Sequence, residues 1–219
     1  MLVVIEGVDG SGKQTQAQML YDRLSENYTI RRLTFPNYES DTSALVKMYL
    51  GGEFGTKPES VNAYASSSFY AVDRIGGFLK DWSKDYNRGD FILCDRYTTS
   101  NAVHQAGKLQ GEEKDKYLDW LFDYEYNLLG LPKPDLVVFL DVPPEVSREL
   151  MKNRSNKITG ESEKDIHESD SDYLTKSYNN ALYVAQKCGW QVIKCVKDGK
   201  LRSIEDINEE IYNLVMEIG

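Results

Sequence analysis

Three features of the sequence predict an α/β fold with a central parallel sheet: short apolar segments of strand length, helical patterns between them, and a glycine-rich segment after the first strand. The apolar segments are rich in Val, Ile, Leu and Phe without polar alternation, as expected for strands covered on both faces. Alternating strands and helices favour a sheet with helices on both sides, a three-layer αβα arrangement. The five predicted strands are Leu2–Glu6, Ile30–Phe35, Phe91–Cys94, Leu136–Leu140 and Gln191–Cys195.

Six further segments have the pattern of helices. We expect one domain over residues 1–219, because no segment has the composition of a linker and no internal repeat is present. Two stretches break the regularity: Asn37–Gly55 is polar and is expected to cover an edge of the site, and Ser155–Asp172 is acidic and loop-like. The predicted helices are Lys13–Ser25, Pro58 to about Tyr86, Glu112–Leu129, Pro144–Arg154, Asp170–Cys188 and Ile204–Ile218.

The composition excludes several functional classes. The 26 basic and 35 acidic residues give a formal charge of −9, which argues against general nucleic-acid binding. No apolar run approaches the roughly 20 residues of a membrane span, and the start, Met1–Ile5, lacks a basic region. Cys94, Cys188 and Cys195 are too scattered for a disulfide framework or a zinc site, so we expect buried, reduced thiols. These features predict a soluble cytoplasmic enzyme.

The segment after the first strand has the P-loop pattern. Residues 7–13 read Gly-Val-Asp-Gly-Ser-Gly-Lys and lead into a predicted helix, which is the context that supports a phosphate site. Glycines let successive N–H groups point at phosphate oxygens, the helix N-terminus adds positive potential, and Lys13 brings a full charge to the outer phosphates. The expected ATP-binding residues are Gly7, Gly10, Ser11, Gly12, Lys13, Gln14 and Thr15.

A second phosphate site is predicted at the end of the third strand. Asp95 can hold the water shell of a magnesium ion, and Arg96 directly after it can reach a phosphate group facing the first. The plainer alternative is a helix-capping aspartate followed by a surface arginine. We expect Mg²⁺, but Gln14 stands where P-loops usually have a serine or threonine ligand, so the first protein ligand of the ion is left open.

With these motifs in place, the sequence resembles the thymidylate kinases, a family of P-loop nucleoside monophosphate kinases. The resemblance extends over nearly the whole chain. It implies transfer of the ATP γ-phosphoryl group to the 5′-phosphate of dTMP, giving dTDP, with ATP and dTMP as partners and a homodimer. The matching motifs are Asp9 within the P-loop, Phe35-Pro36, Tyr70-Ala-Val-Asp73-Arg74, Asp95-Arg96-Tyr97 with Ser100, Asn101 and Gln105, the segment 131–142, and Ser203-Ile-Glu-Asp-Ile.

The resemblance also implies roles for individual residues. Arg96 would bind the acceptor phosphate, Asp9 would approach the sugar 3′-hydroxyl and that arginine, and Tyr70 would stack on thymine. Arg74 would donate to a base carbonyl, and Asn101 or Gln105 would meet the base edge. His104 replaces a family aromatic that crowds position 2′. Simple packing roles for Tyr70 and His104 are the alternatives. The implied substrate-binding set is Asp9, Phe35, Tyr70, Arg74, Arg96, Asn101, His104 and Gln105.

A small mobile lid is expected at about residues 154–170. The P-loop interior has no cation before Lys13, so we expect Arg154, at the junction of helix and lid, to neutralise charge on the transferring group. The alternative is that Arg154 only favours its helix C-terminus. The chain departs from the family at three places. Some relatives have an arginine in place of Tyr38, many have one near Leu150, and bacterial relatives often have an Asp-Arg pair at residues 165–168. The implied catalytic set is Asp9, Lys13, Asp95, Arg96 and Arg154, with Asp95 also at the metal.

Two other functions compete with this interpretation. A kinase for another deoxynucleoside, or for its monophosphate, is the closer alternative because of the departures at Tyr38 and in the lid. A GTPase-type switch is less compatible with the sequence, because no Asn-Lys-x-Asp guanine motif occurs and the last strand leads into Val-Lys-Asp-Gly at 196–199.

Overall fold

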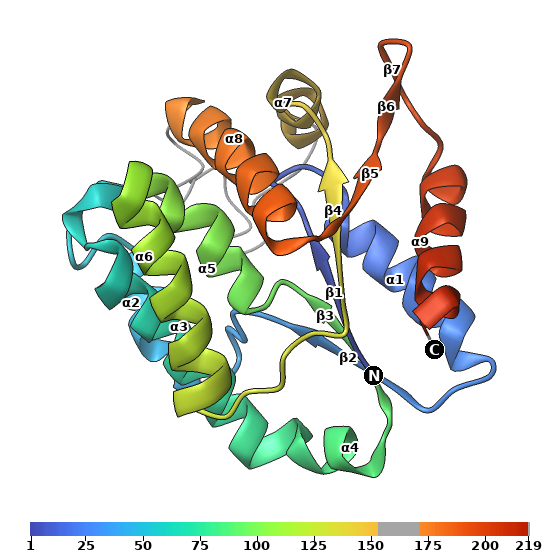
Figure 1. Ribbon diagram of the computed structural model, residues 1–219, viewed down its shortest axis with the longest axis horizontal. Coiled ribbons are helices and arrows are strands. Elements are labelled where there is room, and N and C mark those ends of the chain that lie inside the picture. The colour runs from blue at the N-terminus through green and yellow to red at the C-terminus, as the bar shows by residue number, and fades with distance from the viewer. Residues whose placement is uncertain (153–170, 219) are drawn as a thin grey trace.

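A computed structural model describes residues 1–152 and 171–218 of the chain. At its centre lies a five-stranded sheet in the order β2-β3-β1-β4-β5, and each pair of neighbouring strands is parallel (Figure 1). The predicted P-loop three-layer class is therefore confirmed for the described residues. The strands are β1 (Leu2–Glu6), β2 (Ile30–Thr34), β3 (Phe91–Asp95), β4 (Leu136–Asp141) and β5 (Gln191–Lys194).

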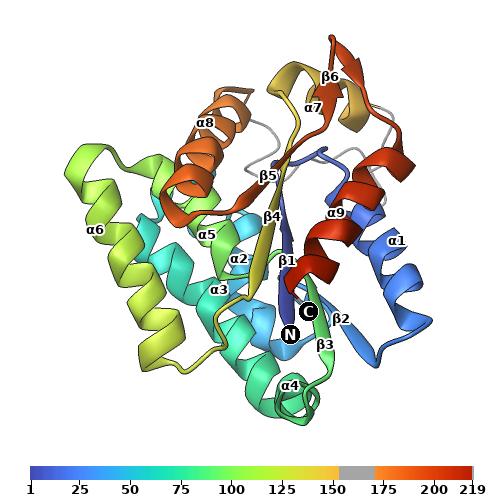
Figure 2. The same cartoon turned by 45° about the vertical axis from the view of Figure 1, so that its right-hand side comes forward.

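Helices cover both faces of this sheet. On one face, α1 (Lys13–Ser25) and α9 (Ile204–Ile218) lie side by side, and the other face is covered by the remaining long helices (Figures 1 and 2). β1 feeds both cores, because successive side chains of a strand point to opposite faces: Val3 and Ile5 pack toward α1 and α9, whereas Leu2 and Val4 pack on the other side. The remaining α-helices are α2 (Ala44–Leu50), α3 (Ala63–Gly77), α4 (Ser83–Arg88), α5 (Thr98–His104), α6 (Gly111–Phe122), α7 (Pro144–Lys152) and α8 (Ser171–Cys188).

Two helices run directly into π-helical turns. The helix predicted from Pro58 begins instead at Ala63, because Pro58–Ser60 forms a separate 3₁₀ turn and the Asn62 side chain caps the new start. α3 passes through the π-turn η3 (Phe78–Trp82) into α4, and α6 passes into the π-turn η5 (Asp123–Leu128). The helix predicted to reach Arg154 is described as far as Lys152, so Arg154 and the lid lie outside the described residues.

The sequence patterns missed four elements, two helices and the two strands of a hairpin, and overstated the burial of two edge strands and one cysteine. α2 lies within the stretch predicted to be irregular, α5 follows β3 directly, and β6 (Val196–Lys197) pairs with β7 (Lys200–Leu201). The two edge strands, β2 and β5, are only partly buried, because no further strand covers their outer sides in the described part of the fold. Cys94 and Cys195 are buried as expected, whereas Cys188 is partly exposed. Across residues 1–152 and 171–218, we find no helix with the length and apolarity needed to cross a membrane.

A buried polar contact joins α1 to α9. Gln16 donates from Nε2 to the carbonyl of Ile204 at 3.0 Å. Asn208 donates to the Gln16 backbone carbonyl at 3.1 Å and to its side-chain oxygen at 3.0 Å. This contact fixes the helix that follows the P-loop against the C-terminal helix.

We predict that Asn208→Ala lowers the free energy of unfolding by about 1–3 kcal/mol, because it leaves a buried glutamine oxygen unpaired. Urea denaturation monitored by circular dichroism measures the loss. An unchanged midpoint would mean that the contact contributes nothing.

Candidate active site

The P-loop backbone favours glycine at positions 7, 10 and 12. Gly10 and Gly12 have φ angles of +79° and +83°, which L-residues rarely adopt. A Cβ atom on Gly7 would lie 2.5 Å from the Ser11 hydroxyl, and one on Gly10 would lie 2.6 Å from the Ser147 carbonyl of α7. The loop is therefore tightly packed against its own turn and against a neighbouring helix.

Lys13 is turned into the loop. Its ammonium group donates to the carbonyls of Gly7 at 2.7 Å and Val8 at 2.9 Å. Burial lowers the pKa of Lys13 to about 8, and repulsion from Arg96 adds to this effect, although Asp9, Asp95 and Glu6 oppose it. The cation that the motif predicts to bind phosphates is thus hydrogen-bonded to two neutral backbone carbonyls.

Arg96 forms the second cationic group of the site. Its guanidinium is paired with the Asp9 carboxylate of the P-loop, and its Nη1 lies 2.9 Å from Nε2 of His104. An arginine can only donate, so His104 accepts at Nε2 and carries its proton on Nδ1. Burial by itself lowers the pKa of Arg96, but the carboxylates of Asp9, Glu6 and Asp95 outweigh it and raise the pKa. The expected contact between Asp9 and Arg96 is present.

Strand pairing brings these groups together. β1 and β3 are neighbours with Ile5 opposite Asp95. The residues that follow the two strands therefore lie together at the carboxyl end of the sheet. Ligands of open α/β sheets bind at the carboxyl ends of the strands. The structure consequently brings the P-loop, Asp95 and Arg96 together at the carboxyl end of the sheet.

Glu6 is a member of this site that the sequence patterns did not reveal. Its side chain is fully buried, and Oε1 accepts from the hydroxyls of Thr99 at 2.6 Å and Ser100 at 2.7 Å. Its other oxygen, Oε2, has no hydrogen-bond partner within the described part of the chain. A charged residue at the end of an otherwise apolar strand was the available signal, but it also fits a simple strand end.

The predicted base-binding residues gather on α3 and α5. Arg74 is 1% exposed and forms a bidentate ion pair with Glu125, while the amide nitrogen of Asn101 lies 3.4 Å from the same carboxylate. Tyr70 is partly exposed and meets Tyr49 edge-on, with ring centroids 6.4 Å apart.

Other predicted residues take structural or peripheral positions. Gln105 is buried and accepts from the Ser66 hydroxyl at 2.7 Å, so its oxygen is used within the fold. Phe35 is buried against Tyr97. Gln14 and Thr15 lie exposed in the first turn of α1. Tyr38 and Leu150, which stand at departures from the family, are also exposed.

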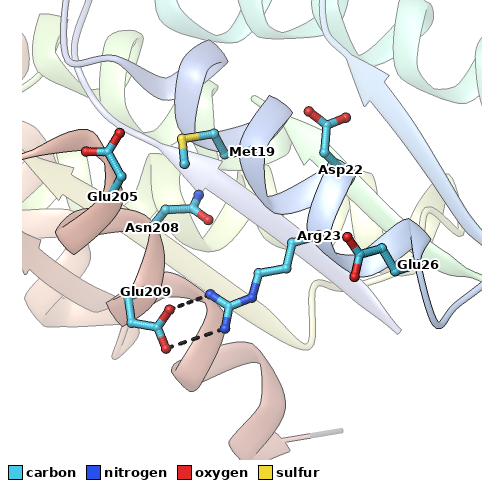
Figure 3. A pocket seen from close by; sticks show the side chains of 7 residues that line it. All are labelled: Met19, Asp22, Arg23, Glu26, Glu205, Asn208 and Glu209. Carbon is cyan, nitrogen blue, oxygen red and sulfur yellow. Dashed lines mark hydrogen bonds and ion pairs between the residues drawn. The ribbon is translucent and has the colours of Figure 1, made fainter.

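A pocket of about 390 Å³ lies elsewhere, between α1 and α9 (Figure 3). Arg23 crosses it to Glu209 at 2.5 Å. Four carboxylates and one arginine line it, a balance that disfavours phosphate, so this pocket is separate from the site at the strand ends. The lining residues are Met19, Asp22, Arg23, Glu26, Glu205, Asn208 and Glu209.

A phosphate loop on β1 and a second cation on the neighbouring β3, within a three-layer αβα fold, define the class of P-loop phosphotransferases. The family model of thymidylate kinase matches residues 5–211. The chain belongs to the thymidylate kinase family. It is 34% identical to the thymidylate kinase of Mycobacterium tuberculosis over 195 residues, which cover 87% of each chain. It is 28% identical to that of Plasmodium falciparum over 218 residues, covering 99% of this chain and 90% of the other.

We predict that Lys13 titrates near pH 8 in the ligand-free protein and that tripolyphosphate shifts its pKa upward, because the anion stabilises the charged form. NMR of lysine labelled at Cε measures both values. Lys108 is a control within the same spectrum, since burial lowers its pKa to about 8 as well, while its ammonium donates to Val61 and Tyr49. A Lys13 signal that the anion leaves unmoved would contradict the assignment.

The same shift has a consequence for stability. The unfolded chain keeps the Lys13 proton up to about pH 10.5, whereas the folded chain releases it near pH 8. The unfolding free energy of the wild type should therefore rise with pH between these values, relative to Lys13→Met. Urea denaturation of both proteins at a series of pH values measures the difference, and parallel curves would contradict the lowered pKa.

Proposed function

We propose that this protein transfers the γ-phosphoryl group of ATP to the 5′-phosphate of dTMP, giving dTDP and ADP. The observation that supports this most directly is the pair of facing cations, Lys13 in the P-loop and Arg96 after the neighbouring strand. One phosphate-binding loop suits any nucleotide hydrolase, but a second cation opposite it suits an acceptor that is itself a phosphate. Family membership supplies the identity of the nucleotides.

Lys13 and Arg96 can both bind phosphate by exchanging their present hydrogen-bond partners. Phosphate oxygens from ATP replace the Gly7 and Val8 carbonyls around Lys13, and the acceptor phosphate replaces or joins Asp9 at Arg96. The protein then holds the two phosphates in line and stabilises charge that spreads over the moving group. This chemistry needs no protein nucleophile. The role of Arg154 as a further cation stays a proposal from the sequence.

A divalent cation fits the charges of this site. Lys13 and Arg96 face three carboxylates, Glu6, Asp9 and Asp95, so the site is net negative before any phosphate enters. Mg²⁺ keeps several waters and usually binds through one or two carboxylates together with substrate phosphates, so these carboxylates suit it. We assign Asp95 to the water shell of the ion, and the Glu6 Oε2 atom is a second acceptor for such waters. Bound Mg²⁺ would neutralise phosphate charge.

The sugar and base are assigned to the residues that the resemblance implies. In this assignment Tyr70 stacks on thymine and Arg74 and Asn101 meet its edge. His104, which contacts Arg96, would crowd a 2′-hydroxyl. Gln105 is less suited to the base, because its oxygen is already bonded to Ser66.

We further propose a cytoplasmic homodimer. Exposed apolar side chains on α3 and on the turn after it, Val72 and Leu79, support an interface between two copies. Three cysteines without a disulfide support a reducing compartment.

We expect turnover of dTMP to exceed that of dCMP and UMP strongly, and that of dUMP moderately, since losing the thymine methyl group is worth only about 1–3 kcal/mol. A coupled assay of ADP release, run with ATP and each acceptor, measures this order. Phosphorylation of thymidine or another deoxynucleoside instead of dTMP would favour the alternative function.

For the metal, Asp95→Asn should lower kcat by orders of magnitude, whereas Gln14→Ala should have little effect at saturating Mg²⁺, because its exposed side chain is not needed at the ion. Steady-state kinetics over a Mg²⁺ series separates the two. A hundredfold loss in Gln14→Ala with intact ATP binding would transfer the metal contact to Gln14.

A further inference from the structure

Glu125 is a buried carboxylate that joins the two helices of the predicted base site. It is fully buried in the π-turn η5 and accepts hydrogen bonds from Arg74 of α3 and from Thr98 and Asn101 of α5. A carboxylate only accepts, so it dictates which atoms of its neighbours face it. One side chain thus sets the orientation of donors on both helices.

Its contacts leave a single edge of Arg74 for other partners. Nε donates to Oε2 at 2.7 Å and Nη2 donates to Oε1 at 2.5 Å, a planar two-bond arrangement that fixes the guanidinium plane. Nη1 makes only a long contact, 3.4 Å, with the Tyr97 carbonyl. Among the described residues, the edge formed by Nη1 and the second N–H of Nη2 therefore holds the donors that remain for a base.

The same carboxylate sets the direction of the Asn101 amide. Nδ2 lies 3.4 Å from Oε1 of Glu125 and 3.3 Å from the carbonyl of Ser67, and both of these atoms only accept. The amide nitrogen must face them, because a reversed amide would oppose oxygen to oxygen. Oδ1 consequently lies on the other side of the amide as an acceptor.

The helical geometry around this network is unusual on both sides. Glu125 lies within η5, and η3 begins four residues after Arg74. π-turns are rare and are found frequently at functional sites, where they shift a side chain out of the regular helical register. Both helices thus depart from regular α-geometry next to this buried pair.

We propose that Glu125 is a positioning residue that determines base specificity, an inference that rests on the proposed dTMP kinase function. By fixing Arg74 and Asn101 it makes the base site present a donor beside an acceptor. Thymine and uracil offer the complement, an acceptor at O4 and a donor at N3. Cytosine offers the reverse, an amino donor at position 4 and an acceptor at N3, so it meets two mismatches.

The test compares kcat/KM for dTMP, dUMP and dCMP in the wild type and in Glu125→Gln. Glutamine has both a donor and an acceptor, so the substitution removes one of the two acceptor-only partners of the Asn101 amide and leaves only the Ser67 carbonyl to oppose its reversal. A reversed amide, which can pair with cytosine, then costs less. The dTMP/dCMP ratio should fall at least tenfold, while the dTMP/dUMP ratio should change less than twofold, because these two bases have the same edge. A uniform loss for all three substrates would overturn the proposal, since a merely structural role moves no ratio.

Asn208→Ala is the matched control. It disrupts a buried polar contact on the opposite face of the sheet, so it should lower stability and leave both ratios unchanged. If Glu125→Gln does not fold, Glu125→Asp keeps the charge but withdraws the oxygens, and the dTMP/dCMP ratio should still fall at least threefold. Unchanged ratios in that variant would also overturn the proposal. Failure of the underlying function looks different, because the wild type itself would then not prefer dTMP to dCMP.

Discussion

The parallel pairing of β1 with β3 is the constraint on which the active site depends. Each strand ends in a short polar segment. The register that sets Ile5 opposite Asp95 brings those segments together at the carboxyl end of the sheet. A slip of one residue would turn the side chains of a strand to the opposite faces of the sheet. Val3 and Ile5 would then leave the core that they share with α1 and α9. The apolar cores on both faces therefore stabilise the geometry of the site.

The two cations at the strand ends are bonded to partners that phosphate oxygens can replace or join. Lys13 is bonded to two carbonyls of its own loop, and Arg96 is bonded to Asp9 and His104. Arg74, in contrast, is bound to a buried carboxylate by two short bonds. Truncating one partner of such a buried pair is strongly destabilising, by about 3–5 kcal/mol, because the other charge is left uncompensated. The cations that we assign to the phosphates are thus adaptable, while the cation that we assign to the base is fixed.

The sequence predicted the features that depend on local pattern. Five strands, most helices and the P-loop follow from apolar runs, glycines and caps, and their bounds agree with the structure to within a few residues. α5 was missed because Thr98, Thr99 and Val103 are weak helix formers, and burial against the rest of the fold stabilises it instead. Buried polar partners were harder to predict for a related reason. Glu125 follows an acidic helix and resembles a surface residue in the sequence, so only the fold reveals that it lies beneath Arg74. The function of such a charged residue is set by a contact across many positions of the chain, which no local pattern records.

The close packing of Gly10 limits how this phosphate loop can vary. Its φ angle is positive, and a Cβ atom at this position would lie 2.6 Å from the Ser147 carbonyl, so there is no space for a side chain. An arginine at position 10 would require α7 to move away. Position 10 therefore cannot supply a cation to the transferring group while α7 keeps its place. For protein engineering, a positively charged side chain at position 10 would require a redesign of α7, which packs against the loop.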